Sequence, residues 1–168
     1  MAGRLSRHSS TLHALSSLFL IGSETDRDAH DALGVVDIVK SVNIAARIHW
    51  LGNRADVPDL LRAFDVFAYP SCGDPCPLSV IEALLAGLPC VVWRDGGTAE
   101  LVVDGETGVL VEKGNIGWLA AAIRTLSENS KLREQMGIDA LADPTRLQDA
   151  QTAARSLRKA LGDVASLR

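Results

Sequence analysis

The sequence predicts an α/β fold in which helices cover a Rossmann-like, doubly wound parallel sheet. Short apolar runs alternate along the chain with segments of helical periodicity, and turns containing glycine or proline join them. This alternation is typical of parallel strands connected by crossover helices. The length of 168 residues suits one domain of ordinary size, or one domain with a short appendage, and the hydrophobic content of 47% is that of a globular protein.

Each expected element rests on a local pattern. Short apolar runs that end at glycine or proline predict buried strands, and apolar residues three and four positions apart predict helices. Thr25 and Asp28 form a capping box at the start of the first helix, and Pro58 is acceptable in the first turn of the second. The expected strands are residues 18–21, 46–51, 65–69, 90–93 and 109–111, and the expected helices are residues 25–43, 56–64, 97–103, 115–136 and 147–161, with a further helix starting near residue 77.

The stretch from residue 67 to residue 97 organises the rest of the chain. It is expected to form a strand, a loop rich in glycine and proline, a helix, a second strand and a Gly-Gly turn. The loop presents free backbone N–H groups and the positive end of the helix dipole at the edge of the sheet. Asp74 in this loop and Glu82 on the helix add two carboxylates. A phosphate-binding helix start beside groups that accept hydrogen bonds from hydroxyls predicts a nucleotide-sugar site.

Both carboxylates also have a simpler interpretation, in which Asp74 caps the turn and Glu82 is an exposed helix residue. Ligands of open α/β sheets bind at the carboxyl ends of the strands, where both residues are expected. Apolar residues flank Glu82 in the sequence, and a carboxylate in apolar surroundings is usually paired or functional. We therefore favour the binding interpretation for both.

The glycine pair at Gly96 and Gly97 is equally open to two interpretations. Glycines after a strand let the backbone approach a ligand closely, and they also suit a tight turn that needs a positive φ. The spacing of the pair, with Glu100 three residues further on, does not decide between the two.

Composition excludes several other classes of function. The net charge of −4 gives no reason to expect a nucleic-acid partner, and no apolar run approaches the roughly 20 residues of a membrane span. Cys72, Cys76 and Cys90 do not have the paired spacing of zinc sites, and the four histidines are scattered. We expect a cytoplasmic protein with no metal site, no nucleic-acid partner and no transmembrane segment.

The run from Pro70 to Asn115, PSCGDPCPLSVIEALLAGLPCVVWRDGGTAELVVDGETGVLVEKGN, resembles the donor-binding half of glycosyltransferase family 4 enzymes. That family has the GT-B fold, in which two Rossmann-like domains face each other across a cleft. Its pattern is a Pro-Ser strand end, an acid, seven residues, a glutamate, a block of alanine, glycine and proline, and two glycine-bearing turns. The resemblance covers roughly residues 18–126. The matching positions are Asp74, Glu82, Ala83, Ala86, Gly87, Pro89, Gly96, Gly97, Glu100, Asp104, Gly105 and Gly108.

The resemblance implies retaining transfer of a sugar from a UDP-, GDP- or ADP-sugar, with no cofactor and no essential metal. It implies catalytic positions at Asp74, which would contact the sugar, and at Glu82, which would hold the ribose hydroxyls. Amides at the helix start would bind the diphosphate, and the loop after Gly52 would lie near the base. The donor-binding residues so implied are Arg4, Gly52, Asn53, Arg54, Pro77, Leu78, Ser79, Glu82, Gly96 and Gly97.

Two positions depart from the family pattern. Asp74 stands where the family usually has glutamate, so its carboxylate is one methylene shorter. Ser9 stands where a lysine usually neutralises the diphosphate, which leaves Arg4 or Arg94 as the substitute cation. Without such a cation the charge of the leaving group is less well stabilised.

The resemblance also sets the expected domain organisation. Residues 1–140 would form the donor-binding domain and residues 141–168 a C-terminal amphipathic helix, with the acceptor-binding domain absent. Transfer depends on closure of two domains, so the isolated chain is expected to be inactive without a partner that supplies the acceptor half. The alternative is a non-catalytic nucleotide-binding or protein-interaction remnant, whose open face is covered by another chain or by self-association.

Overall fold

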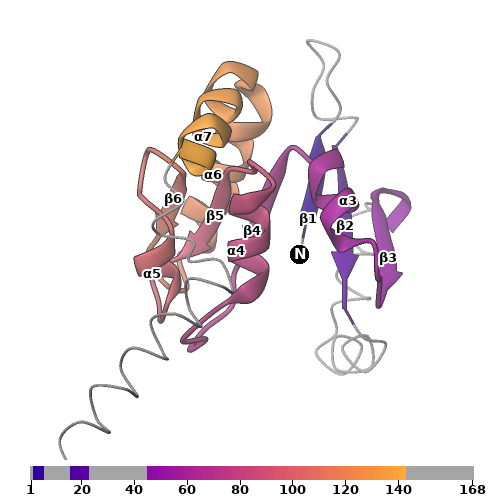
Figure 1. Cartoon of the computed structure of the whole chain (residues 1–168), viewed down its shortest axis with the longest axis horizontal. Coiled ribbons are helices and arrows are strands. Elements are labelled where there is room, and N and C mark those ends of the chain that lie inside the picture. Colours follow the sequence, from indigo (N-terminus) through magenta and orange to yellow (C-terminus); the bar gives the residue numbers. More distant parts are fainter. Residues whose placement is uncertain (1, 6–15, 23–44, 143–168) are drawn as a thin grey trace, which may run out of the picture.

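The computed structural model describes residues 2–5, 16–22 and 45–142, which form a sheet with helices packed against it (Figure 1). Except for β1 and the 3-10 helix η2, which were not predicted, the helices and strands lie where local sequence signals predict them. The elements are β1 (Ala2–Leu5), β2 (Ser16–Ile21), a 3-10 helix η2 (Ala45–Arg47), β3 (Ile48–Gly52), α3 (Val57–Ala63), β4 (Val66–Tyr69), α4 (Leu78–Leu85), β5 (Cys90–Trp93), α5 (Thr98–Leu101), β6 (Gly108–Val111), α6 (Ile116–Glu128) and α7 (Ser130–Ala142).

These bounds confirm the predicted strands and the predicted helices within the described ranges. The segment expected to be one helix over residues 115–136 is divided at Asn129 into α6 and α7. The predicted helices at residues 25–43 and 147–161 lie outside the described residues.

The sheet has the strand order β3-β2-β1-β4-β5-β6. β2 pairs in parallel with β3, and β5 pairs in parallel with both β4 and β6. β1 is antiparallel to β2 and to β4, so those two strands point the same way. The C-terminal ends of all strands except β1 therefore lie along one edge of the sheet, where open α/β sheets bind ligands.

The direction of β1 differs from the parallel sheet that the sequence predicts, although the α/β class is confirmed. The connection from β1 to β2 consists of residues 6–15. A parallel crossover needs a dozen or more residues, usually including a helix. A connection of this length instead suits an antiparallel pair, in which Leu5 lies opposite Ser16.

Side chains alternate across the strands and build a core on each face of the sheet. On one face, Cys90 and Val92 of β5 pack in the same cluster as Val80 and Leu84 of α4. On the other face, Val91 belongs to a cluster with buried residues of α6. Because helices cover both faces, the prediction of a doubly wound sheet is confirmed for this part of the molecule.

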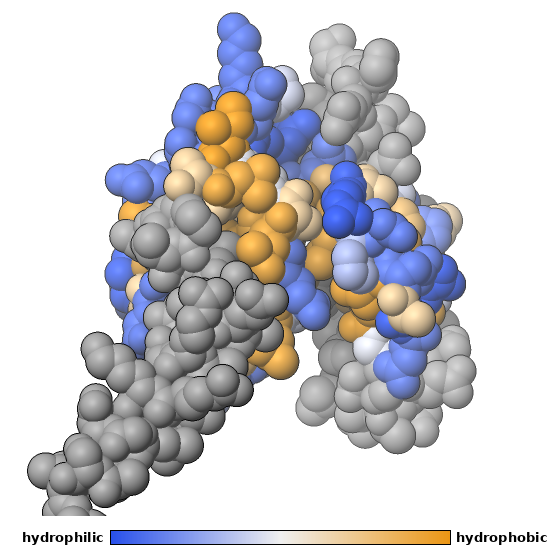
Figure 2. Space-filling model, viewed as in Figure 1, coloured by the Kyte–Doolittle hydropathy of each residue, from blue (hydrophilic) through white to orange (hydrophobic). Residues whose placement is uncertain are grey.

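The surface retains apolar side chains on the outer sides of the helices. Figure 2 shows an apolar ridge over α4 and α7. The large apolar side chains exposed on these two helices are Leu78, Leu85, Ile138 and Leu141. Among the described residues, no helix combines the length and apolarity needed to cross a membrane.

Candidate functional site

Three loops lie along the edge formed by the C-terminal ends of the strands. They follow β3, β4 and β5, and they contain the glycines, carboxylates and free amides that the sequence singled out. The loop between β4 and α4, residues 70–77, is called the central loop here. It follows the strand next to β5, whereas β1 and β2 lie between β4 and β3.

The carboxylate of Asp74 accepts two hydrogen bonds within and beside the central loop. Its Oδ2 accepts a hydrogen bond of 2.8 Å from the hydroxyl of Tyr69, and its Oδ1 accepts one of 3.0 Å from the backbone N–H of Cys76. Both carboxylate oxygens thus organise the turn, as the simpler interpretation predicts. Each retains a lone pair that can accept a ligand hydroxyl, because an ionised carboxylate has about four acceptor sites.

The loop after β5 forms hydrogen bonds with the central loop. The backbone N–H of Gly73 donates to Asp95 Oδ2 at 2.7 Å, and that of Gly97 donates to the carbonyl of Asp74 at 2.9 Å. The Nζ of Lys113 lies 3.2 Å from Asp95 Oδ2. The Gly73 hydrogen bond, followed by that of Lys113, lowers the pKa of the Asp95 carboxyl. The loop before α4 is therefore fixed in place without help from a ligand.

This contact between loops explains both glycines of the pair. A Cβ on Gly96 would lie 2.4 Å from the carbonyl oxygen of Asp74, and one on Gly97 would lie 2.3 Å from that of Pro75. Gly96 also has a φ of +56, as the turn interpretation expects, but Gly97 is the N-cap of α5 with a φ of −70. The constraint on Gly97 is therefore the close approach of the two loops.

The first turn of α4 offers unpaired donors. Pro77 is the N-cap and provides no side-chain hydrogen bond. The N–H of Val80 donates to the carbonyl of Pro77. Within the described chain, the amides of Leu78 and Ser79 find no acceptor. Such unpaired amides at a helix start, together with the helix dipole, form an anion-binding arrangement.

Glu82 is exposed on α4, and this corrects the expectation that apolar residues surround it. The helix buries Val80, Ala83 and Leu84 on its inner side. Glu82 lies on the opposite side, in line with the exposed Leu78 and Leu85, because residues four and three positions apart share one helix face. Its carboxylate has no hydrogen-bond or ion-pair partner within the described residues, so it is free to meet a ligand.

The loop after β3 reaches the same edge. Gly52 adopts a φ of +63 at the end of the strand, and Asn53 beside it is exposed. Arg54 forms a bidentate ion pair with Asp56, with N–O distances of 2.8 and 2.7 Å. This hydrogen bonding raises the pKa of Arg54 and lowers that of Asp56.

Among the described residues, the cations of this edge all have carboxylate partners. Besides Arg54 and Lys113, Arg94 contacts Asp104 at 3.3 Å and Glu112 at 3.1 Å. The side chains of Arg54, Arg94 and Lys113 are each between 42% and 53% exposed, so water screens these pairs and a ligand can still reach them.

The backbone position of Arg4 lies away from the candidate site. The pairing of β1 places it opposite Ser17, near the start of β2. That is the opposite edge of the sheet from the loops described above, because β1 runs against its neighbours. The antiparallel direction of β1 therefore separates Arg4 from the other residues that the resemblance implies.

The thiols of the described chain are free, and no three His, Cys, Asp or Glu side chains of the described residues are grouped so as to hold a metal ion. Cys72 and Cys76 are exposed in the central loop. Cys90 is buried in β5, and this burial raises the pKa of its thiol.

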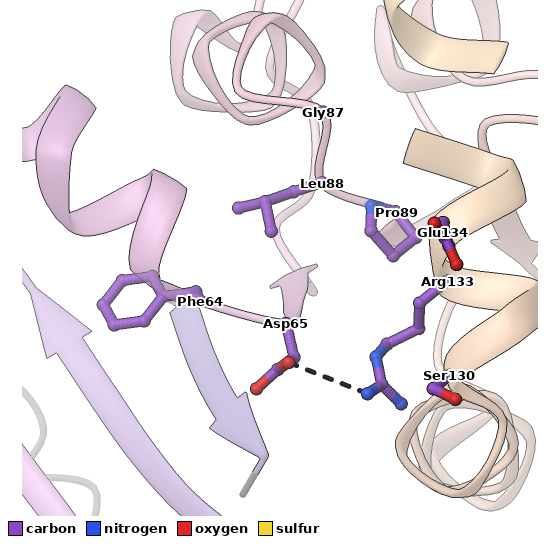
Figure 3. Close-up of a pocket in the computed structure, with 8 residues that line it drawn as sticks. All are labelled: Phe64, Asp65, Gly87, Leu88, Pro89, Ser130, Arg133 and Glu134. Carbon is purple, nitrogen blue, oxygen red and sulfur yellow. Dashed lines mark ion pairs between the residues drawn. The ribbon is translucent and has the colours of Figure 1, made fainter. Parts of the chain in front are cut away.

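A cavity of about 540 Å³ opens at the other edge of the sheet (Figure 3). Asp65 at the start of β4 and Arg133 on α7 point toward each other across it, with an N–O distance of 3.7 Å. Phe64, Leu88 and Pro89 supply apolar walls. This cavity lies away from the loops after β3, β4 and β5, so it is separate from the candidate site.

Sequence reasoning missed two residues that shape the candidate site, Tyr69 and Asp95. A signal existed for Tyr69, because a polar-tipped aromatic at the end of a strand places its hydroxyl at the edge of the sheet. No local signal marked Asp95, whose partners Gly73 and Lys113 are 22 and 18 positions away.

Comparison with known proteins connects this geometry to a family. Residues 11–142 match the model of the family described as glycosyl transferases group 1. The D-inositol 3-phosphate glycosyltransferase of Corynebacterium diphtheriae is 35% identical over 134 residues, which are 79% of this chain and 31% of that protein. The UDP-Gal:alpha-D-GlcNAc-diphosphoundecaprenol alpha-1,3-galactosyltransferase of Escherichia coli is 35% identical over 91 residues, or 54% of this chain and 24% of that protein.

Solved structures share the fold. Anabaena HepE, in a complex with UDP, superposes with a TM-score of 0.78 at 28% identity, covering 88% of this chain and 41% of that one. Sucrose-phosphate synthase from Thermosynechococcus elongatus has a TM-score of 0.80 at 22% identity, covering 90% of this chain and 39% of that one.

The chain thus spans 31% of the Corynebacterium relative and 41% of the HepE chain. The family model, in contrast, covers most of the chain, from the segment before β2 to the end of α7. The chain therefore belongs to the group 1 glycosyl transferases.

Proposed function

We propose that this chain is the donor-binding half of a retaining glycosyltransferase of family 4, with a UDP-sugar as its donor. The observation that carries the proposal is the meeting of the free amides of Leu78 and Ser79 with the exposed carboxylate of Glu82 on one helix, at the ligand-binding edge of the sheet. Amides that can bind an anion, next to a carboxylate that can accept hydrogen bonds from hydroxyls, match a diphosphate joined to a ribose.

Each part of the donor then has a place. The diphosphate would accept hydrogen bonds from the Leu78 and Ser79 amides, where the helix dipole also favours negative charge. Glu82 would accept hydrogen bonds from the ribose hydroxyls. Asp74, at the end of the central loop, would face the sugar, and the loop from Gly52 to Arg54 would lie beside the base.

The choice of uridine among the three candidate bases rests on a neighbour. Structures of HepE, 26–28% identical to this chain, hold UDP, UDP-glucose, or UDP and glucose. GDP and ADP remain as comparison ligands in the test below.

The proposal is tested by titrating the 168-residue chain calorimetrically with UDP, GDP and ADP. We expect UDP to bind most tightly and Glu82→Ala to weaken it by about 1–3 kcal/mol, since two ribose hydroxyls would lose a charged acceptor. The exposed Glu128 at the end of α6 provides the matched control, and Glu128→Ala should leave the affinity for UDP unchanged.

An equal loss of affinity in both variants, or no loss in a folded Glu82→Ala variant, contradicts the ribose-binding role. Absence of UDP binding by the folded wild-type chain contradicts the donor site as a whole. Circular dichroism and urea unfolding establish in each case that the variant is folded.

Transfer itself would require an acceptor-binding half facing this edge. Two facing domains orient the donor and acceptor and exclude water, which the one wall described here cannot do. The proposal therefore includes an acceptor half, supplied by another part of the protein or by a partner chain. The free thiols of the described residues suit a reducing, cytoplasmic location, which is part of the same proposal.

A second candidate function is nucleotide binding without transfer. The pairing of Arg54, Arg94 and Lys113 with carboxylates favours it, because a leaving diphosphate needs positive charge that is not already neutralised. Release of UDP from a UDP-sugar on addition of a candidate acceptor domain supports the transferase. Tight UDP binding without release under any such addition supports the second candidate.

A further inference from the structure

Tyr69 has an unusual position for the only tyrosine of the chain. It is the last residue of β4, so its side chain is carried to the edge where the candidate site lies. Its hydroxyl donates a hydrogen bond of 2.8 Å to Asp74 Oδ2. One phenol therefore ties the end of β4 to the central loop.

The same hydroxyl determines the orientation of the Asp74 carboxylate. The backbone of Asp74 is already fixed, because its carbonyl accepts from Gly97 and lies against Gly96. The side chain is held by the N–H of Cys76 at one oxygen and by Tyr69 at the other. Removal of the Tyr69 hydroxyl would leave Oδ2 without this anchor, and only the hydrogen bond from the Cys76 N–H to Oδ1 would then orient the carboxylate.

We propose that Tyr69 is a positioning residue, which fixes Asp74 so that the remaining lone pairs of its carboxylate face the sugar of the bound donor. This inference rests on the proposed function, in which Asp74 lies on the sugar side of the site. The physical reason is preorganisation: a carboxylate held before binding loses less conformational freedom when the sugar hydroxyls arrive. Tyr69 and Asp74 thus act as one unit in recognising the sugar.

The test uses Tyr69→Phe in the full chain, which removes one oxygen and keeps the ring that stacks 6.3 Å from Phe67. Dissociation constants are measured by calorimetry for UDP and for UDP-glucose, UDP-galactose and UDP-N-acetylglucosamine. The decisive quantity is a ratio of two dissociation constants, that of UDP divided by that of the UDP-sugar which binds most tightly. We expect Tyr69→Phe to lower this ratio about five- to tenfold while changing the constant for UDP less than about twofold.

Asp74→Asn and the double variant complete a mutant cycle. Asp74→Asn should lower the ratio by a similar factor, and the double variant should lower it no further than Asp74→Asn alone, because coupled residues are not additive. A purely structural role for the hydroxyl would weaken UDP and UDP-sugars equally. That result, or an unchanged ratio in Tyr69→Phe, overturns the inference while the donor site stands.

An optical titration examines the contact without any donor. Burial raises the pKa of Tyr69, and its hydrogen bond to Asp74 raises it further. Because the chain has one tyrosine, its ionisation can be followed directly by absorbance. Asp74→Asn should lower this pKa toward the ordinary value of tyrosine, and an unchanged value would show that the contact is absent and overturn the inference.

The remaining outcomes separate the inference from the function on which it rests. In one outcome, the wild-type chain binds UDP and every UDP-sugar equally tightly. That result would contradict the sugar-facing role of Asp74 and therefore the positioning role of Tyr69. It would not contradict nucleotide binding. Failure of the wild-type chain to bind UDP removes the proposed function and the positioning role together, while the optical titration still reports whether the contact exists.

Discussion

At the scale of single residues, the candidate site depends on backbone positions that no side chain can occupy. Gly97 has an ordinary φ of −70, yet its Cβ direction points at the carbonyl oxygen of Pro75. The residue is glycine because two loops touch there. This differs from Gly105, which has a φ of +82 and open space around its Cβ position.

These two glycines allow the steric contact to be separated from backbone strain. Gly97→Ala should lower the free energy of unfolding by about 2–4 kcal/mol, because the methyl group forces the loops apart. Gly105→Ala, the matched control, should lower it by about 1–2 kcal/mol through the left-handed conformation alone. Urea unfolding measures both, and a Gly97→Ala variant as stable as Gly105→Ala would show that the loops do not touch in solution.

The residues also show where sequence reasoning succeeds and where it ends. Asp74 caps the turn of its loop, as the simpler interpretation expects, and its ligand-binding role stays a prediction. The surroundings of Glu82 were judged from its neighbours in the sequence, whereas a helix sends successive residues to different faces. The partners of Asp95 were beyond local inspection, because contacts between separate loops arise from the arrangement of the strands.

At the scale of elements, a buried ion pair that no local sequence pattern predicted connects α7 to the sheet. Arg133 and Asp65 are 11% and 6% exposed. Arg133 also donates to the carbonyls of Leu126 and Ser127, at 2.5 and 2.9 Å, near the C-terminal end of α6. One guanidinium thus joins α7, the end of α6 and the start of β4, and this fixes the helices on their side of the sheet.

Replacement of this arginine should be costly for stability. Arg133→Leu should lower the free energy of unfolding by about 3 kcal/mol, because Asp65 and two carbonyl groups lose a buried donor. Arg133→Lys, which keeps the charge without the forked geometry, should lose less. Urea unfolding gives the values, with the exposed Arg124→Leu of α6 as a control expected within about 0.5 kcal/mol of the wild-type chain. A loss no larger than that of the control would show that the ion pair is unimportant.

The order and type of most elements followed from local signals, since apolar runs, glycines and prolines mark the ends of strands and helices. The direction of β1 did not. It depends on whether the chain before β2 is long enough for a crossover, and residues 6–15 are too few. No strand was predicted over residues 2–5, so the direction of β1 was not predicted either.

At the scale of the whole molecule, this chain alone is expected to bind its ligand without catalysing a reaction on it. The described edge carries the residues that we propose to bind the donor, and nothing in the described residues faces this edge from the other side. Water would reach the sugar freely, and no acceptor would be oriented for attack.

We therefore expect the 168-residue chain to release no UDP from whichever UDP-sugar it binds, above the background of Glu82→Ala. A coupled assay for free UDP measures this at saturating donor. Steady release in the wild-type chain, absent in Glu82→Ala, would mean that these residues already contain a complete catalytic site.

The contact between the loops after β4 and β5 also limits how this sequence can change over generations. The N–H of Gly97 meets the carbonyl of Asp74, and the N–H of Gly73 meets the carboxylate of Asp95. An insertion in either loop would move one member of each pair away from the other, so a tolerated insertion in one loop would demand a compensating change in its neighbour. Descendants of this chain should therefore inherit the two loops as a single unit of variation, while the loop after β3 varies independently.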